Sequence, residues 1–343
     1  MKKILFATTA LIATASVAAA DVRLSGYGRF GLDYNDSNDA LRIDSDGDGV
    51  LDQVRSSTNI TSRMRIQFDM STESDSGVEF GGRVRLQGES RDNKVDGGGL
   101  GGNTAANGAR FYASYGGFTV QFGNIAGAID SMAGLYLPTS SADTGIDGMG
   151  FNALVAMNSY DAYSSNGTGS NGFELIYSSG SFGAHVSYSQ ANDTTTGAAP
   201  AAIVEGRRLV GATVSYTFGD WTAALGLNDS NAVGSGDMII GTLTGDLGQF
   251  GLGVAFAQNE GAGGLNDDAT KIRVYGTMDI GSAGTLLIWA ANTSYDVAGN
   301  LDDGTDFGIN YKHDLGGGVS FDAGFVDTTQ GQTQVQAGVY FRF

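Results

Sequence analysis

The sequence predicts an all-β protein, built as one antiparallel up-and-down barrel of about 16 strands that crosses a membrane. Three observations lead to this fold class. Apolar and polar residues alternate along most of the chain, the alternating segments number about 16, and short connections take turns with long ones. Composition agrees, because a chain of 343 residues with 55 glycines, 2 prolines and no cysteine must be stabilised by backbone pairing rather than by disulfides.

The first twenty residues have the pattern of a secretory signal peptide. Lys2 and Lys3 precede an apolar run from Ile4 to Val17, and three alanines follow before Asp21. We therefore expect residues 1–20 to be removed and residues 21–343 to form a single transmembrane barrel domain. The formal charge of −18 becomes about −20 without the two lysines, which disfavours nucleic acid as a partner.

Period-two alternation is clear in the first three predicted strands. In the second, apolar Ile60 and Phe68 share one parity, while Arg63 and Arg65 share the other. A strand places these two sets on opposite faces, so one face would meet water and the other a nonpolar surrounding. These three strands cover Val22–Asp33, Asn59–Met70 and Val78–Glu89.

Further segments of roughly 7 to 12 residues follow, near the length that a tilted strand needs to cross a bilayer. The expected strands are Ala109–Tyr115, Phe118–Gly123, Gly172–Ser179, Phe182–Ser189, Arg208–Phe218, Trp221–Asn228, Asp237–Leu247, Gln249–Gln258, Ala269–Ile280, Thr285–Asn292, Asp306–Asp314, Val319–Asp327 and Thr333–Phe343.

Short and long connections alternate along the chain. Tight joints such as "YGGF", "SSGS" and "FGDW" alternate with long ones, of which the first four are Asn35–Ser57, Ser90–Gly108, Asn124–Asn171 and Gln190–Arg207. Short turns at one end and long loops at the other are typical of a barrel threaded through a membrane. A soluble β-sandwich or a large soluble barrel also alternates, but the strand number, the arginine-rich polar face and the near absence of a second buried face disfavour both.

A barrel of 16 strands is too wide for its side chains to fill, so another element must set its aperture. The longest connection, Asn124–Asn171, contains Asp130, Asp143, Asp147 and Asp161 but no lysine or arginine. If this loop folds inward, its acids would face bases on the wall and create a transverse field. The candidate bases are Arg23, Arg63, Arg65, Arg83, Arg85 and Arg110.

The chain resembles a Gram-negative general porin. The opening "DVRLSGYGRFGLDY" and the stretch "IDGMGF" are most similar to porins of the Rhodobacter type, and the alternating end "VQAGVYFRF" resembles the terminal strand of outer-membrane barrels. The resemblance implies an outer-membrane homotrimer, in contact with lipid and lipopolysaccharide, that passes ions and small hydrophilic solutes. It also implies that loop acids among Asp130, Asp143 and Asp147 lie opposite the wall arginines.

The stretch "DSDGDGVLD" has the spacing of a calcium loop. Asp44, Asp46 and Asp48 occupy positions 1, 3 and 5, Val50 offers a carbonyl at 7, and Asp52 follows at 9. Position 12 is an arginine, so the bidentate ligand of an EF-hand is missing. We expect a structural Ca²⁺ that orders the first external loop; the alternative is a solvated acidic turn.

No enzymatic motif accompanies this pattern. "GYGRFG" has the spacing of a dinucleotide loop but lies within a strand and opens no helix. His185 lies near Ser187 with no orienting acid evident in the sequence. We expect a passive channel with mild cation preference; the alternatives are a substrate-specific channel of the same fold, a barrel enzyme or an adhesive barrel with a plugged lumen.

Overall fold

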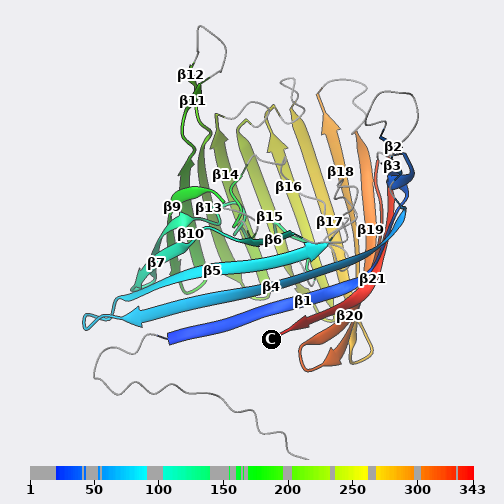
Figure 1. Ribbon diagram of the computed structural model, residues 1–343, viewed down its shortest axis with the longest axis horizontal. Helices are drawn as coiled ribbons and strands as arrows, with labels where there is room; N and C mark the ends of the chain where they lie inside the picture. The colour runs from blue at the N-terminus through cyan, green and yellow to red at the C-terminus, as the bar shows by residue number, and fades with distance from the viewer. Residues whose placement is uncertain are drawn as a thin grey trace, which may run out of the picture.

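The computed structural model describes residues 21–40, 42–43, 53–54, 56–90, 103–139, 154, 160–163, 165, 169–195, 203–231, 236–261, 268–296, 303–329 and 331–343. Within these residues the chain forms a closed antiparallel barrel of 16 long strands (Figure 1). Closure is made by β1, which pairs with β4 on one side and with the C-terminal β21 on the other.

The wall strands follow one another around the barrel in chain order. They are β1 (Asp21–Asn35), β4 (Thr58–Glu73), β5 (Glu79–Ser90), β7 (Arg110–Tyr115), β8 (Phe118–Asn124), β9 (Asn171–Ser179), β10 (Phe182–Gln190), β13 (Arg208–Phe218), β14 (Trp221–Ser230), β15 (Met238–Leu247), β16 (Phe250–Asn259), β17 (Ala269–Ile280), β18 (Gly284–Tyr295), β19 (Gly304–Gly316), β20 (Val319–Asp327) and β21 (Thr333–Arg342).

Short elements lie between the wall strands. β6 (Asn103–Ala106) pairs with β5, in a connection that the sequence analysis treated as a loop. The others are the 3-10 helix η1 (Asp36–Ala40), the pair β2 (Arg42–Ile43) and β3 (Gln53–Val54), and the pair β11 (Thr194–Thr195) and β12 (Ile203–Val204). No helix among the described residues is long and apolar enough to span a membrane.

The sequence prediction of the strands is confirmed, with ends that shift by up to about three residues, as is usual for element boundaries. The bounds of β13, β17 and β20 agree with the prediction. The tight turns also form where expected. In the turn between β7 and β8, Gly116 and Gly117 have φ angles of 58° and 86°, which glycine adopts without strain and which suit a two-residue hairpin.

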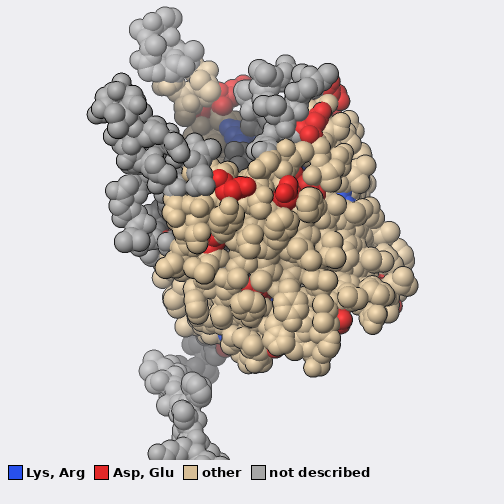
Figure 2. All heavy atoms as spheres, turned by 90° about the vertical axis from the view of Figure 1, so that its right-hand side faces the viewer, with Lys and Arg blue, Asp and Glu red and all other residues tan. Residues whose placement is uncertain are grey.

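The two faces of each strand differ as the alternation predicts. On β1, the outward Val22 and Leu24 are 66% and 57% exposed, whereas the inward Arg29 and Asp33 are 2% and 0% exposed. Figure 2 shows an outer surface in which a broad band has few charged residues and acidic residues gather along its upper edge. A continuous apolar band that extends over many strands suits a nonpolar surrounding, because monomeric soluble proteins rarely expose contiguous apolar surface of this extent.

The glycines of "GYGRFG" make room at the closing seam. The ring of Phe343 covers Gly26, and the ring of Phe341 covers Gly28, so that a Cβ at either glycine would overlap the neighbouring ring. Glycine in a strand often marks such a close approach. The structure therefore gives this motif a packing role in the wall.

Candidate functional site

The described part of the connection between β8 and β9 lies on the inner surface of the barrel. We call its described residues, 124–139, 154, 160–163, 165 and 169–171, the inner loop. The side-chain hydroxyl of Thr242, on the inward face of β15, donates to the carbonyl oxygen of Ala133 at 2.7 Å. Asn259 of β16 donates to the carbonyl oxygen of Leu154 at 3.1 Å. The inner loop thus follows the wall on which β15 and β16 lie.

Apolar contacts hold the inner loop to that wall. Ile129, Met132, Leu135 and Leu154 pack against inward side chains of β14, β15 and β16, and Leu137 packs against β18 and β20. Burying an aliphatic side chain contributes about 1.5–3 kcal/mol, so the loop is a packed part of the barrel. The wall side chains are Ala224, Met238, Ile240, Ala255, Ala257, Leu287, Trp289, Ala291 and Val326.

This apolar inner wall was not predicted from the sequence. The alternation described for the first strands does not hold on β15, where Ile239 and Ile240 are both apolar and point to opposite faces, 40% and 0% exposed respectively. Strands with apolar residues on both faces are the sequence signal that could have identified the surface against which the inner loop packs. A water-filled lumen alone would not favour them.

Arg273 of β17 docks the backbone of the inner loop. Its two terminal nitrogens donate to the carbonyl oxygens of Leu135 and Gly134, each at 2.7 Å. The side chain is 1% exposed. A planar guanidinium with several fixed donors suits this role, because it can satisfy two adjacent carbonyls together.

Glu174 and His185 lie where the inner loop leaves the wall. The carboxylate of Glu174 accepts from the backbone N–H of Gly127, and the Ser187 hydroxyl accepts from Ala128 at 2.9 Å. His185 Nε2 lies 3.6 Å from Glu174 Oε1. The structure thus corrects one sequence reading, since an acid does lie beside His185, contributed by the adjacent strand. Both side chains are buried against the root of the loop.

Asp161 anchors the returning part of the inner loop. Its carboxylate accepts from Arg207 at 2.6 Å, and Arg207 also donates to the Ser170 hydroxyl at 3.3 Å. Asp161 is 4% exposed. Its position separates it from the loop acids expected to face the arginines, in keeping with its late place in the loop.

The expected arginines lie on the inner faces of β1, β4, β5 and β7. The register aligns Arg23 with Asp69, Asp69 with Arg83, and Arg83 with Arg110, so the four form one row across the strands. The next three inward-facing rows, taken in order along the barrel axis, also contain arginines. The first row contains Arg85, the second contains Arg65, and the third contains Arg63 paired with Arg29. The structure brings the six predicted bases together on one wall.

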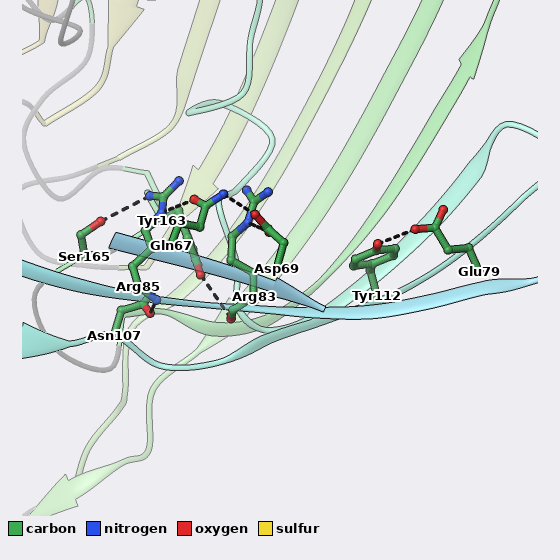
Figure 3. Close-up of polar contacts among 9 residues, drawn as sticks. All are labelled: Gln67, Asp69, Glu79, Arg83, Arg85, Asn107, Tyr112, Tyr163 and Ser165. Carbon is green, nitrogen blue, oxygen red and sulfur yellow. Dashed lines mark hydrogen bonds and ion pairs between the residues drawn. The ribbon is translucent and has the colours of Figure 1, made fainter. Parts of the chain in front are cut away.

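Acceptors on the same wall bind several of these arginines. Arg63 Nε lies 2.8 Å from Glu89, and Arg83 Nε lies 2.5 Å from Asp69. The side-chain carbonyls of Gln87 and Gln67 accept from Arg65 and Arg85, each at 2.8 Å. Figure 3 shows Arg83 and Arg85 projecting from β5 beside Gln67 and Asp69. These acceptors share the parity of the arginines in the sequence, but their pairing with individual arginines was not predicted.

Tyr163 connects the inner loop to the arginine wall. The guanidinium carbons of Arg85 and Arg110 each lie 4.3 Å from the centre of its ring. The Tyr163 hydroxyl donates to the Arg83 carbonyl oxygen at 3.4 Å, and Arg85 donates to the Ser165 hydroxyl at 3.3 Å. Cation–π contacts of this kind favour positive charge over the ring. The inner loop therefore contacts the wall of β5 and β7 as well as that of β14–β18.

Asp130 is the only one of the three predicted loop acids that lies among the described residues. Its carboxylate accepts a hydrogen bond from the Tyr136 hydroxyl. Burial raises the pKa of Asp130, although hydrogen bonds from Tyr136 and the Tyr163 backbone and the charge of Arg85 act in the opposite direction. Asp143 and Asp147 lie outside the described residues, so their positions relative to the arginines stay a prediction.

The expected calcium ligands Asp44, Asp46, Asp48, Val50 and Asp52 also lie outside the described residues. Among the residues that the structure does describe, no group of three or more His, Asp or Glu side chains is arranged to hold a metal ion.

Comparison with known proteins agrees with this architecture. The family described as Gram-negative porin matches residues 7–333. A porin of Fuscovulum blasticum is 33% identical over 180 residues, which cover 51% of this chain and 53% of that protein. The chain thus matches about half the length of this curated relative.

Solved structures agree over a larger part of the chain. A mutant of the porin of Rhodopseudomonas blastica matches with a TM-score of 0.70 and 24% identity, over 94% of this chain and all of that one. A triple mutant of the same porin matches with a TM-score of 0.69 and 23% identity, over the same shares. These two likenesses show the fold, and with the family match they confirm the resemblance noted in the sequence: the chain belongs to the Gram-negative porin family and is a β-barrel of the outer membrane.

Proposed function

We propose that the protein is a passive channel through which ions and small hydrophilic solutes diffuse across the outer membrane. The observation that supports this most directly is the inner loop, which is packed on the inner wall of β14–β18 and reaches the arginines of β5 and β7 through Tyr163. A loop held at both sides would narrow a 16-stranded barrel, whose lumen is too wide for wall side chains to fill. The remaining opening would set the size limit for solutes.

The charges around this opening favour hydrated, polar solutes. Arg23, Arg63 and Arg65 line one wall, and Asp130 lies on the inner loop. Asp143 and Asp147 are proposed to complete the acidic side. Opposite charges across a narrow pore create a transverse field, which is strengthened by the low dielectric constant of the surrounding protein. The overall acidity of the chain supports mild preference for cations.

Two further parts of the proposal concern assembly. The family relationship supports a homotrimer embedded in outer-membrane lipid and lipopolysaccharide. The aspartate spacing from Asp44 to Asp52 supports a structural Ca²⁺ in the first external loop. Both belong to the scaffold, since a diffusion channel requires no catalytic cofactor.

Single-channel recording in a planar bilayer tests the proposed channel. We expect stepwise insertion events, each with a large current that is proportional to voltage. Reversal potentials in a KCl gradient should show weak selectivity for K⁺. Folded protein that inserts without current steps would instead indicate a plugged barrel, and strong anion preference would contradict the proposed charge balance.

A further inference from the structure

A polar cavity of about 350 Å³ lies inside the barrel between the row of Arg23, Asp69, Arg83 and Arg110, which forms part of its lining, and the end where the tight turns are. It is formed by the inward faces of β1, β4, β5, β7 and β8. Its lining includes Arg23, Arg83 and Arg110 together with Ser114, Thr119 and Gln121. The volume would accommodate a solute the size of a monosaccharide. The cavity lies apart from the contacts that anchor the inner loop to β14–β18.

The positive charges in this cavity exceed the negative charges. Arg23, Asp69, Arg83 and Arg110 stand in one row across adjacent strands, with strands about 4.8 Å apart. One carboxylate therefore lies among three guanidinium groups. Glu79 also borders the cavity, but it accepts a hydrogen bond from the Tyr112 hydroxyl at 2.7 Å (Figure 3).

The same contacts leave donors available in the cavity. Asp69 accepts from Arg83 at 2.5 Å and from Gln67 at 2.7 Å. The Arg110 guanidinium lies over the face of the Tyr163 ring. This contact does not use the oxygen or nitrogen acceptors to which guanidinium N–H groups normally donate. Among the described residues, neither Arg23 nor Arg110 is hydrogen-bonded to a carboxylate.

Groups that bind hydroxyls lie beside these arginines. Ser114 and Thr119 hydroxyls are 2.9 Å apart. The side-chain oxygen of Gln121 is buried and has no hydrogen-bond partner among the described residues. A buried acceptor without a donor is unfavourable, and a solute hydroxyl or water would satisfy it. The cavity thus combines anion-binding donors with a polar edge.

We propose that this cavity is a binding subsite for small anionic polyols, which carry a phosphate or a carboxylate together with several hydroxyls. The anionic group binds at the guanidinium groups that line the cavity, of which Arg23 and Arg110 are not held by a carboxylate within the described part of the chain. The hydroxyls bind at Ser114, Thr119 and Gln121. Guanidinium groups suit this role because their fixed donors match phosphate and carboxylate oxygens. The inference rests on the proposed function, because the solute reaches the cavity through the lumen. The channel would then retain such solutes briefly while letting neutral sugars pass.

Single-channel recording at low ionic strength, where charge interactions are least screened, tests the subsite. Glucose 6-phosphate, gluconate and glucose are added in turn on the side of the tight turns. We expect the two anions, but not glucose, to reduce the mean conductance with saturation. A lower half-blocking concentration for glucose 6-phosphate than for gluconate would indicate a site that prefers phosphate, and the reverse would indicate a site that prefers carboxylate.

Arg23→Gln combined with Arg110→Gln should raise the half-blocking concentration about tenfold or more, because hydrogen bonds to charged groups are among the stronger ones. Arg208→Gln is the matched control. This arginine carries the same charge but lies at the other end of the barrel, half exposed beside Glu205. It should leave the block unchanged. Arg23→Gln alone, at an exposed position, provides a milder variant if the double variant does not fold.

Calorimetric titration of the detergent-solubilised protein with glucose 6-phosphate gives a second measure that does not depend on conduction. Weaker binding of glucose 6-phosphate to the double variant than to the wild type would support the subsite. If the wild type also gives no current steps, the same result would contradict the proposed channel. Normal current steps with equal effects of glucose and the anions, and no calorimetric difference between wild type and double variant, would overturn the subsite and leave the channel standing.

Discussion

Gly26 and Phe343 exchange two backbone hydrogen bonds and thereby close the barrel between its first and last strands. Gly26 N–H donates to the Phe343 carbonyl oxygen at 2.9 Å, and Phe343 N–H donates to the Gly26 carbonyl oxygen at 3.1 Å. The Phe343 ring also lies over Gly26. The Phe343 backbone thus extends the hydrogen-bonded ladder between β1 and β21, which joins the described strands in a closed ring.

Gly26→Ala tests this seam. A Cβ at this position would collide with the backbone carbonyl oxygen of Arg65, which cannot move without shifting β4. We expect the free energy of unfolding to fall by about 1–3 kcal/mol, as in other overpacked sites. Urea unfolding followed by gel mobility measures the change. Gly241→Ala is the control, since a Cβ there meets no atom within 4 Å. An equal decrease in the free energy of unfolding in both variants would contradict close packing at the β1–β21 seam.

Arg273→Met should loosen the inner loop. The substitution keeps an unbranched side chain but removes the donors to the Leu135 and Gly134 carbonyls, and each buried carbonyl left without a partner costs about 1–3 kcal/mol. We expect stronger fluctuations of the open-channel current and faster protease cleavage within the loop. Arg208→Met, at an exposed pair with Glu205, should leave both unchanged. If the open-channel current of the Arg273 variant fluctuates no more than that of the wild type, the apolar contacts alone hold the loop.

Asp130→Asn should alter the pH dependence of stability. Because burial raises the pKa of Asp130, the native state favours the neutral carboxyl. The stability that this preference contributes is fully present below the unfolded pKa of about 4 and is lost as pH rises through the higher folded pKa. The variant, which is neutral throughout, should therefore gain stability relative to wild type as pH rises.

Melting of both proteins from pH 4 to pH 8 measures this effect. Asp75→Asn, on the exposed turn between β4 and β5, is the matched control. A difference between wild type and the Asp130 variant that stays constant across the pH range would contradict a raised pKa.

Chelation of calcium should lower the melting temperature if the first external loop binds this ion. Asp44, Asp46, Asp48 and Asp52 would repel one another without a cation. We expect calcium to stabilise the wild type but not the variant with Asp46→Asn and Asp48→Asn. Melting with calcium and with chelator, for both proteins, gives four curves; four identical curves would support a solvated acidic turn.

The sequence by itself predicted most of the fold, because the signals that specify it are local. Alternation with period two depends only on neighbouring residues, and it placed Arg63 and Arg65 on the inner face and Ile60 on the outer one. Glycine pairs such as Gly116 and Gly117 located a tight turn for the same reason. Local patterns also grouped the six arginines on the early strands.

Only the tertiary structure decided which side chains meet. The register places Asp69 between Arg23 and Arg83, and barrel closure brings Phe343 to Gly26, although no local pattern relates these positions. The packing of Leu135 on the wall of β14–β16 and the docking of its carbonyl by Arg273 depend on residues that are far apart in the sequence. A strand's own sequence determines its face, whereas its register and its position around the barrel follow from pairing and packing with distant strands.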